Sequence, residues 1–510
     1  FPYTTLFRSC MSLKKVTFKS ATMVTADNKN FFSNCGSDFK IYVPSFAVNS
    51  YKLDPYWYNY PIEGFSTADI TDWTINAELT LYSQDRLEGT PNVTIGSSGA
   101  WTVNGDKVQT VNNLKTVRQS KLLSNCNNMS IAGNYTHSIN VDAKKWYFLS
   151  LPFDFKVGEL TNSAGAQMVV YHYNGANRAE NGTGNNWLRY TDSDIITTGT
   201  GFIIQTSLAT TITFTALNND MKQNVVSYKM FTKPLEANES EQKSNKGWNL
   251  VGNPWQAYYN IHKLNFTAPI TVFNNSTSKY TAYSVIDDDY AIGPNTAFFV
   301  QCPDEVDEIS FPVDGRQITS KIESQNGARS AQPSERKLID VELTDGNQTD
   351  KTRFVMNPQA SLEYELNRDA SKFFALDEDA LHIYTIEQSV QLAINERPLA
   401  GGTVVLGISI AKDGNYTLSG PRNQFQNIVL VDKETNIETD LSSNEYNFSA
   451  LAGTHENRFM LRIGSSVVTE IDNTKQGDTM TNNYFNLNGQ SVKKPSKGVF
   501  VVNGKKVIIK

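Results

Sequence analysis

The sequence lacks the long apolar run that a membrane-spanning helix requires. Such a helix needs about 18 or more consecutive apolar residues, and none of the 510 residues belongs to a run of that kind. Long stretches rich in Ala, Leu, Glu and Lys are also nearly absent, whereas Asn, Thr, Ser, Tyr (23) and Phe (27) are abundant. This composition favours strands and turns, so we predict a mostly-β fold without a transmembrane segment.

An excess of basic residues is absent too. The chain has 46 Lys and Arg residues against 52 Asp and Glu residues, which gives a net charge of -6. Proteins that bind nucleic acid normally carry a basic surface, so we expect no nucleic-acid partner. The length is sufficient for several domains with sizeable cores.

Cysteine is scarce and carries no paired motif. Cys10, Cys35, Cys126 and Cys302 are scattered without a CxxC pair. In a chain of this size, that pattern argues against a disulfide framework and against a zinc site. Buried free thiols are the simpler interpretation, and a single disulfide stays open as the alternative in an exported protein.

Catalytic and metal-binding motifs are missing as well. The five histidines are far apart, and His455 with Glu456 begins like a zinc-protease helix but has no second His. Two acidic runs, residues 287–289 and 377–379, could supply oxygen ligands to a structural calcium ion, yet they lack the spaced Asp pattern of a calcium loop. We therefore predict a protein that is not an enzyme and has no cofactor, with solvated loops at both acidic runs.

Residues 1–9, FPYTTLFRS, are excluded from the fold prediction. Their sequence resembles the translated end of a common short-read sequencing adapter. We interpret this segment as an artefact and expect that natural protein sequence, including any signal peptide, is missing before it.

The last segment, residues 481–510, predicts a small β-module with a positive charge. Two Asn-Gly turn signals separate apolar runs, and the segment has six lysines and no carboxylate. The pattern L-x-G-Q, P-x-K-G-x-F-V-V and K-K-V-I-I-K resembles the C-terminal sorting domains of Bacteroidota proteins exported by type IX secretion. The residues that carry this resemblance are Leu487, Gly489, Pro495, Gly498, Lys505, Lys506 and Lys510.

The beginning of the chain, residues 10–65, predicts the terminal part of a solenoid. Residues 16–18 and 41–43 are strand-like triplets 25 residues apart, and a period of this length with one strand per repeat is typical of leucine-rich repeats. The stretch KIYVPSFAVNSYKLDPYWYNY resembles the closing unit of BspA-like leucine-rich repeats. That resemblance implies a short helix at residues 46–53 and an aromatic cap made by Tyr56, Trp57, Tyr58 and Tyr60.

The next segment, residues 66–145, predicts β-structure. Trp73, Ile75, Ala77, Leu79 and Leu81 alternate with mostly polar neighbours, and residues 93–95 and 101–103 suggest short strands or a hairpin. Whether this segment is a domain of its own or an extension of the next one stays open.

Residues 146–315 contain an internal duplication. The stretch WYFLSLPF at residue 146 aligns with WNLVGNPW at residue 248, residues 169–171 align with 271–273, and residues 201–205 align with 297–301. Two copies of one β-unit packed into a single body are the simplest account. The stretch WNLVGNP also resembles a motif of surface proteins from the same bacteria.

A polar linker at residues 316–337 precedes a predicted β-sandwich at residues 338–465. The strands of this sandwich are expected at residues 338–343, 353–356, 391–395, 403–410, 428–432 and 458–463. A second linker, residues 466–480, leads to the tail.

Five aromatic residues in polar loops of the duplicated unit are the candidate ligand contacts, because Tyr and Trp rings stack on sugars and anchor protein partners. They are Trp187, Tyr190, Tyr280, Tyr283 and Tyr290, at comparable places in the two copies. Packing within the fold is the alternative role for each of them.

Together these features predict a secreted or outer-membrane surface protein, a fragment with a non-catalytic role in binding or adhesion. Its expected partners are the secretion machinery, through the tail, and an unidentified extracellular protein or glycan. Two alternatives stay open. In one, the chain is the accessory and sorting region of a secreted peptidase or glycoside hydrolase whose catalytic domain is missing upstream. In the other, the duplicated unit is a carbohydrate-binding module.

Overall fold

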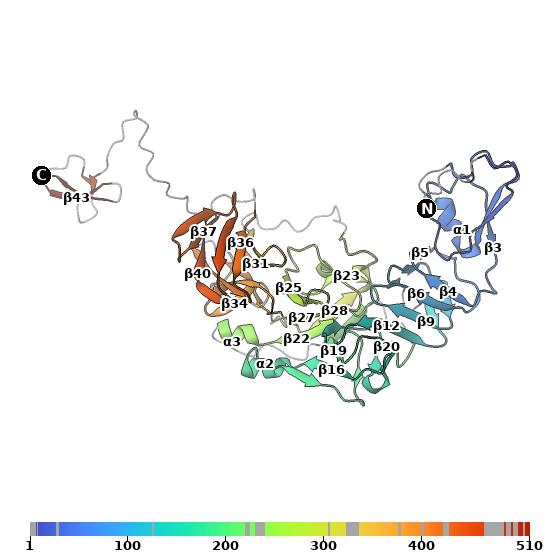
Figure 1. Cartoon of the computed structure of the whole chain (residues 1–510), viewed down its shortest axis with the longest axis horizontal. Coiled ribbons are helices and arrows are strands. Elements are labelled where there is room, and N and C mark those ends of the chain that lie inside the picture. Colours follow the sequence, from blue (N-terminus) through green and yellow to red (C-terminus); the bar gives the residue numbers. More distant parts are fainter. Residues whose placement is uncertain are drawn as a thin grey trace. The chain divides into compact units, whose positions relative to one another are not determined.

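The computed structural model describes the chain in two compact units, residues 1–464 and 465–510, which we treat separately (Figure 1). The residues that it describes are 7, 9–26, 30–124, 127–219, 225–229, 240–303, 306–322, 336–375, 379–398, 402–421, 428–463, 484–485, 491–492, 498–502 and 505–509. The expected mostly-β fold is confirmed, since strands far outnumber helices throughout these residues. Cys126 and residues 466–480 lie outside the described residues.

The first unit begins with a small parallel sheet made of β1 (Lys15–Thr17), β2 (Lys40–Pro44) and β3 (Ile62–Phe65). Val16 pairs with Ile41, so the two predicted triplets are neighbouring strands of one stack. The 3-10 helix η1 (Ser45–Ala47) and α1 (Val48–Leu53) form the predicted helical segment. β3 pairs with β2 and so continues the stack beyond the predicted closing unit. Of the predicted cap, Trp57 is buried, but Tyr56 and Tyr58 are exposed.

Residues 72–141 form a β-solenoid of successive turns, each about 20 residues long, that the sequence did not reveal. Parallel strands stack on three faces. The first face contains β4 (Asp72–Ile75), β6 (Asn92–Ile95), β9 (Leu114–Val117) and β12 (Tyr135–Val141). The second contains β5 (Glu78–Leu81), β7 (Ala100–Val103) and β10 (Lys121–Leu123), and the third contains β8 (Gln109–Val111) and β11 (Met129–Ile131).

The interior of this solenoid explains the alternation seen in the sequence. Trp73, Ile75, Leu79 and Leu81 are all buried, but Ala77 is exposed at a corner, so the run is two strands on different faces. β6 and β7 likewise lie in different sheets and do not form a hairpin. At one corner, side-chain amides join successive turns, because Asn92 Nδ2 donates to Asp72 Oδ1 at 2.9 Å and Asn112 Nδ2 donates to Asn92 Oδ1 at 2.9 Å.

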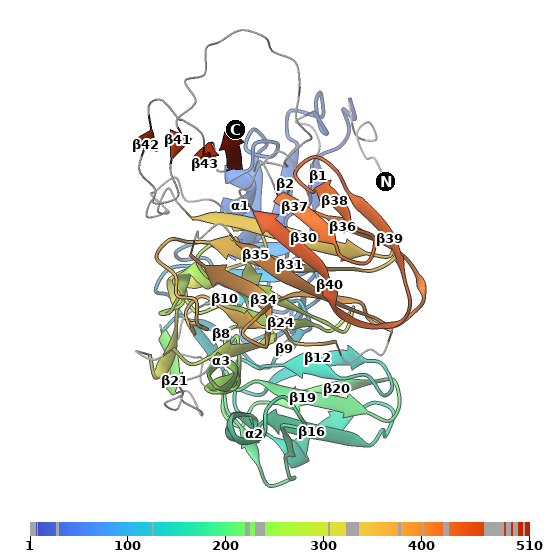
Figure 2. The same cartoon turned by 90° about the vertical axis from the view of Figure 1, so that its left-hand side faces the viewer.

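The solenoid is continuous with the duplicated body. β20 (Thr210–Thr215) pairs antiparallel with β12, and β15 (Thr161–Asn162) pairs with β20, which gives a six-stranded sheet (Figure 2). One hydrophobic core runs from Ala21 through the solenoid to Phe214. Residues 66–145 are therefore an extension of the neighbouring segment, which the sequence had left open.

The duplicated body has two sheets of identical connectivity. The first contains β13 (Tyr147–Leu149), β19 (Phe202–Thr206), β16 (Met168–Tyr173) and β17 (Trp187–Arg189). The second contains β22 (Trp248–Gly252), β27 (Ala297–Gln301), β24 (Ile270–Asn274) and β25 (Lys279–Tyr283).

Smaller elements repeat beside them. They are β14 (Phe155–Lys156) with β18 (Ile195–Ile196) and η2 (Val157–Glu159) in the first copy, and β23 (Tyr258–Asn260), β26 (Ala291–Ile292) and η3 (Ile261–Lys263) in the second. β21 (Val225–Lys229) pairs with β28 (Glu308–Pro312). The 3-10 helix η4 (Val313–Gly315) follows β28 and leads to β29 (Arg316–Gln317), which pairs with β23.

The two copies meet along matching strands. Leu149 bridges Thr296, and the equivalent pair, Val251 and Thr200, bridges in the same way. The alignment of residues 169–171 with 271–273 differs from the structure by two residues, because Val170 lies opposite Ile204 whereas Ile270 lies opposite Val300. A shift of two residues in a strand keeps the same side chains on the same face, so the sequence pattern survives the error.

Residues 337–463 form a single curled sheet rather than two stacked ones. Its order is β38 (Ile437–Asp440), β37 (Ile428–Asp432), β40 (Gly453–Ile463), β35 (Thr403–Ile410), β33 (His382–Glu387), β34 (Val390–Arg397), β31 (Thr349–Met356), β30 (Lys337–Thr344), β36 (Gly414–Ser419) and β39 (Tyr446–Ala450), with β32 (Ala370–Ser371) on β34. The hydroxyl of Tyr446 on one edge strand donates to Asp432 Oδ2 at 2.8 Å, so the sheet nearly closes. Every strand that the sequence predicted in this segment is present.

The second unit is a four-stranded sheet in the order β42 (Ser491–Val492), β41 (Tyr484–Phe485), β43 (Gly498–Val502) and β44 (Lys505–Ile509). Val502 lies opposite Lys505, so two residues connect these strands, as the Asn-Gly signal predicts. Gly498, Lys505 and Lys506 lie in β43 and β44, and the other tail residues named above, Leu487, Gly489, Pro495 and Lys510, lie outside the described residues.

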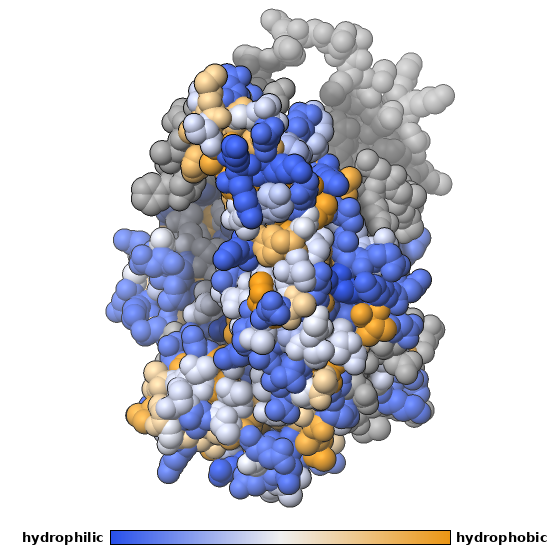
Figure 3. Space-filling view, turned by 90° about the vertical axis from the view of Figure 1, so that its right-hand side faces the viewer, coloured by the Kyte–Doolittle hydropathy of each residue, from blue (hydrophilic) through white to orange (hydrophobic). Residues whose placement is uncertain are grey.

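The face shown in Figure 3 is mainly hydrophilic, and its apolar residues form scattered spots rather than one broad patch. Among the described residues, no helix is long and apolar enough to cross a membrane.

Candidate functional site

An opening of about 460 Å³ lies between the duplicated body and the curled sheet of the first unit. We call it the aromatic cleft. Its lining side chains include Tyr173, Arg178, Trp187, Tyr280, Phe373 and Phe374. Pockets that combine aromatic rings with a few polar groups are the usual form of small-ligand sites, so this cleft is the candidate binding site.

The aromatic rings of the cleft form one packed cluster. The Tyr173 ring lies 5.1 Å from that of Trp187, and the Tyr280 ring lies 5.3 Å from that of Phe373. Phe299 is buried behind them, 4.8 Å from Tyr173 and 4.7 Å from Phe373. Because the rings support each other, their faces are held in place before any ligand binds.

The duplication places Trp187 and Tyr280 at equivalent positions. Trp187 lies opposite Tyr173 in one hairpin, and Tyr280 lies opposite Phe273 in the other. Both rings approach Phe148 edge-on at 5.7 Å. These two predicted ligand contacts therefore meet in one cluster, as their comparable sequence positions suggested.

A short insertion gives the first copy a feature that the second lacks. The loop between β16 and β17 contains α2 (Gly175–Asn181), whereas β24 and β25 are joined by a tight turn. Asn174 caps the helix by accepting a hydrogen bond from the Asn177 amide at 3.0 Å, and Gly182 ends it with a φ of 75°. Figure 1 shows α2 beside α3 (Ser240–Asn245), which in turn lies next to β34. The helix positions Arg178 in the cleft.

Arg178 is 2 % exposed. Its guanidinium carbon lies 4.5 Å from the ring centre of Trp248 and 4.8 Å from that of Phe373. Nη1 lies 3.3 Å from the Tyr173 hydroxyl, and Nε lies 3.3 Å from Asn245 Oδ1. The cation is thus stacked between rings and bonded to neutral side chains.

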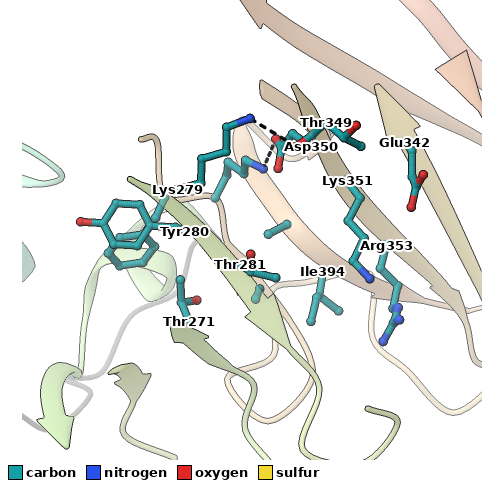
Figure 4. A pocket seen from close by; sticks show the side chains of 14 residues that line it. Thr271, Lys279, Tyr280, Thr281, Glu342, Thr349, Asp350, Lys351, Arg353 and Ile394 are labelled. Atoms are coloured by element: carbon teal, nitrogen blue, oxygen red, sulfur yellow. Dashed lines mark hydrogen bonds and ion pairs between the residues drawn. The ribbon is translucent and has the colours of Figure 1, made fainter. Parts of the chain in front are cut away.

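A second opening, of about 220 Å³, adjoins the cleft and shares Tyr280, Lys372 and Phe373 with it (Figure 4). Its walls are more highly charged. Lys372 Nζ donates to Asp350 Oδ2 at 2.6 Å, and Lys279 Nζ donates to the Thr349 carbonyl at 3.3 Å. These cations are therefore already engaged by groups of the protein.

Buried ion pairs hold the curled sheet against the duplicated body. Arg336 bonds Asp287 at 2.5 Å and Glu396 at 2.5 Å, and Arg353 bonds Asp288 at 3.0 Å. Asp287 and Asp288 come from the acidic run that was expected to be a solvated loop with calcium as the alternative. That expectation was wrong, because the carboxylates face arginines across the junction.

The other three predicted aromatics lie outside the cleft. Tyr283 and Tyr290 stack on each other with ring centres 3.7 Å apart, and burial raises the pKa of both phenols. Tyr190 packs against His172 at 4.8 Å, and burial raises its pKa to about 12. Packing within the fold accounts for these three residues.

The structure also assigns structural partners to the polar motifs. Glu456 accepts hydrogen bonds from Gln391 and Tyr384, and His455 Nε2 lies 2.9 Å from the Leu451 carbonyl. Among the cysteines, Cys302 is buried as expected, whereas Cys10 and Cys35 are only partly buried. Within the described part of the chain, no cluster of His, Cys, Asp and Glu is arranged to hold a metal ion.

Sequence reasoning missed Arg178, Phe373 and Phe374, which complete the cleft. The one available signal for Arg178 was the longer loop in the first copy of the duplicated unit. No comparable signal exists for the two phenylalanines, because only the folded junction brings them to the cleft.

In the comparison with known protein families, residues 255–463 match a family described as a domain of unknown function (DUF8693). This range covers most of the second copy and the curled sheet, whereas Tyr173, Arg178 and Trp187 lie before it. No curated protein and no solved structure matches the chain.

Proposed function

We propose that this chain is part of an exported, non-catalytic binding or adhesion protein that engages surface macromolecules through the aromatic cleft. The observation that carries the proposal is the cleft itself, about 460 Å³ in volume and walled by Tyr173, Trp187, Tyr280 and Phe373. Its rigid ring cluster resembles a stacking surface more than a catalytic constellation.

The ligand class that suits this cleft best is carbohydrate. Sugar rings present apolar faces that stack on aromatic side chains, and their hydroxyl groups bond to amides and hydroxyls. Asn186, Asn245, Ser371 and Gln391 place such groups around the rings, where each also bonds to a group of the protein. This chemistry favours the carbohydrate-binding alternative over a flat protein-binding surface.

Phe374 allows the clearest test, because it lines the cleft and is 39 % exposed. We expect Phe374→Ala to weaken binding on a glycan array roughly tenfold, since the loss of one aromatic stacking contact costs on the order of 1 kcal/mol. Tyr58→Ala, which removes an exposed ring far along the chain, serves as the control. Absence of binding to any glycan at millimolar protein would remove the carbohydrate assignment.

The export part of the proposal rests on the lysine-rich tail and its resemblance to sorting domains. If the tail directs secretion, a chain without residues 481–510 should fold but remain inside the cell envelope of its host. Fractionation of the producing cells, with protease accessibility of the surface fraction, measures this. Normal surface display of the shortened chain would contradict it.

A further inference from the structure

Arg178 differs from the other buried arginines of the first unit. Arg353, Arg397 and Arg458 are each bonded to carboxylates, at 2.6 Å, 2.9 Å and 2.9 Å. Arg86 donates to the backbone carbonyl of Lys107 at 2.7 Å. Arg178 has neither kind of partner among the described residues.

Within the described part of the chain, Arg178 is therefore a buried positive charge without a counter-charge. A charged group removed from water is costly unless an opposite charge or several strong hydrogen bonds compensate it. The two hydrogen bonds of Arg178 are 3.3 Å long and go to neutral groups, and its Nη2 atom has no hydrogen-bond partner among the described residues. The contacts with Trp248 and Phe373 offset part of the cost.

The unpaired guanidinium lies in the wall of the aromatic cleft rather than in a closed core. Lys372, the other cation of the cleft, is already paired with Asp350. The cleft therefore offers one anion-binding group beside a stacking surface. The planar guanidinium matches a carboxylate, which it can bind through two parallel hydrogen bonds.

We propose that the aromatic cleft binds an acidic sugar, with Arg178 bonded to the sugar carboxylate and the ring of Trp187 or Tyr280 stacked on the pyranose. The inference rests on the proposed function, since it names the ligand class of the same cleft. The carboxylate can come from a uronic acid or from a sialic acid, and the two share the chemistry that Arg178 recognises.

Titration calorimetry on the full chain tests this with four probes. They are trigalacturonate, its fully methyl-esterified form, 3′-sialyllactose and lactose. We expect at least one acidic probe to bind roughly tenfold or more tightly than its neutral counterpart, because hydrogen bonds to charged groups are the strong ones. The preferred acidic probe distinguishes the two sources.

Substitutions that each remove one positive charge distinguish recognition by Arg178 in the cleft from an effect of the protein's net charge. Arg178→Gln should abolish the difference between acidic and neutral probes, and Arg178→Lys should restore only part of it, because an ammonium group cannot form the paired bonds. Arg189→Gln removes an equal charge from an exposed position on β17 and should change nothing. The comparison of acid and ester on the unaltered chain needs no variant to fold.

Two outcomes would overturn the inference in different ways. Equal binding of acidic and neutral probes, or an unchanged preference in Arg178→Gln, would remove the acidic-sugar assignment and leave glycan binding intact. Absence of binding to all four probes and to a glycan array would remove both the acidic ligand and the proposed function.

Discussion

At the scale of single residues, the junction between the two copies depends on one glycine. The Ser150 amide donates to the Asn295 carbonyl at 3.2 Å, and the equivalent Gly252 amide donates to the Gly199 carbonyl at 2.8 Å. Gly199 and Asn295 both have positive φ, 77° and 59°, so the two crossings share the same backbone shape. A Cβ atom on Gly252 would overlap the Cβ atom of Ser150.

Exchange of these two residues tests the symmetry. Gly252→Ser should lower the free energy of unfolding by about 1–3 kcal/mol, because the added side chain collides with Ser150 in a packed core. The double variant Ser150→Gly with Gly252→Ser should recover most of that loss, since the larger residue then occupies the other side of the same crossing. Denaturant unfolding measures both.

The matched control for this pair is Gly184→Ala, because nothing lies within 4 Å of the added Cβ atom there. Its effect should stay within about 0.5 kcal/mol, as for most open surface positions. If the double variant were as unstable as the single one, the crossing would not be the symmetric contact described above.

At the scale of elements, the sequence predicts the strands and the duplication well, but it does not reveal the solenoid of residues 72–141. The strands of the curled sheet, the tail hairpin and the pairing of residues 16–18 with 41–43 all follow from β-branched runs and turn residues. These features are local, so a few consecutive residues of the sequence are sufficient to predict each strand or turn.

The sequence did not reveal the solenoid, because its repeated residues lie about 20 positions apart and not within one short stretch. Residues 72–75 and 92–95 align with each other, but the third turn replaces their outward threonine with Lys115. The spacing between paired residues also changes from 20 to 21, so a strict period does not fit. Within one turn, each strand alternates like any half-buried strand and gives no hint of three faces.

The candidate site shows the same limit. Trp187 and Tyr280 were found from composition and position, because aromatic side chains in polar loops stand out. Tyr190, Tyr283 and Tyr290 satisfied the same criterion, and they differ from the first two because the fold places them outside the cleft. Phe373 and Phe374 belong to the cleft through tertiary contacts that no local pattern encodes.

At the scale of the whole first unit, the cleft exists only because two bodies are fixed against each other. One wall belongs to the duplicated body, and the other belongs to residues 371–374 and β34. The Tyr364 hydroxyl donates to Gln301 Oε1 at 2.6 Å, which adds a neutral contact to the arginine pairs at this junction. Binding should therefore depend on residues that touch no ligand.

Substitution of Arg336 tests whether ligand binding depends on residues that hold the two bodies together. Its side chain is 7 % exposed, and it bonds Asp287 and Glu396, which are 4 % and 2 % exposed. In Arg336→Gln two buried carboxylates lose their main cation, so the free energy of unfolding should fall by about 3–5 kcal/mol. We expect the melting transition in calorimetry to broaden or split, and glycan binding to weaken although no cleft residue changes.

Replacing all three charged groups by neutral amides distinguishes the effect of an unpaired charge from the effect of a changed side-chain shape at this junction. The triple variant Arg336→Gln, Asp287→Asn and Glu396→Gln has no unpaired charge from this cluster and should regain part of the stability and of the binding. Lys412→Gln breaks an exposed pair with Asp379, 67 % and 62 % exposed, and should have almost no effect. Full binding by an Arg336→Gln chain with a split transition would mean that the duplicated body alone holds the ligand, and the second wall of the cleft would have no part in recognition.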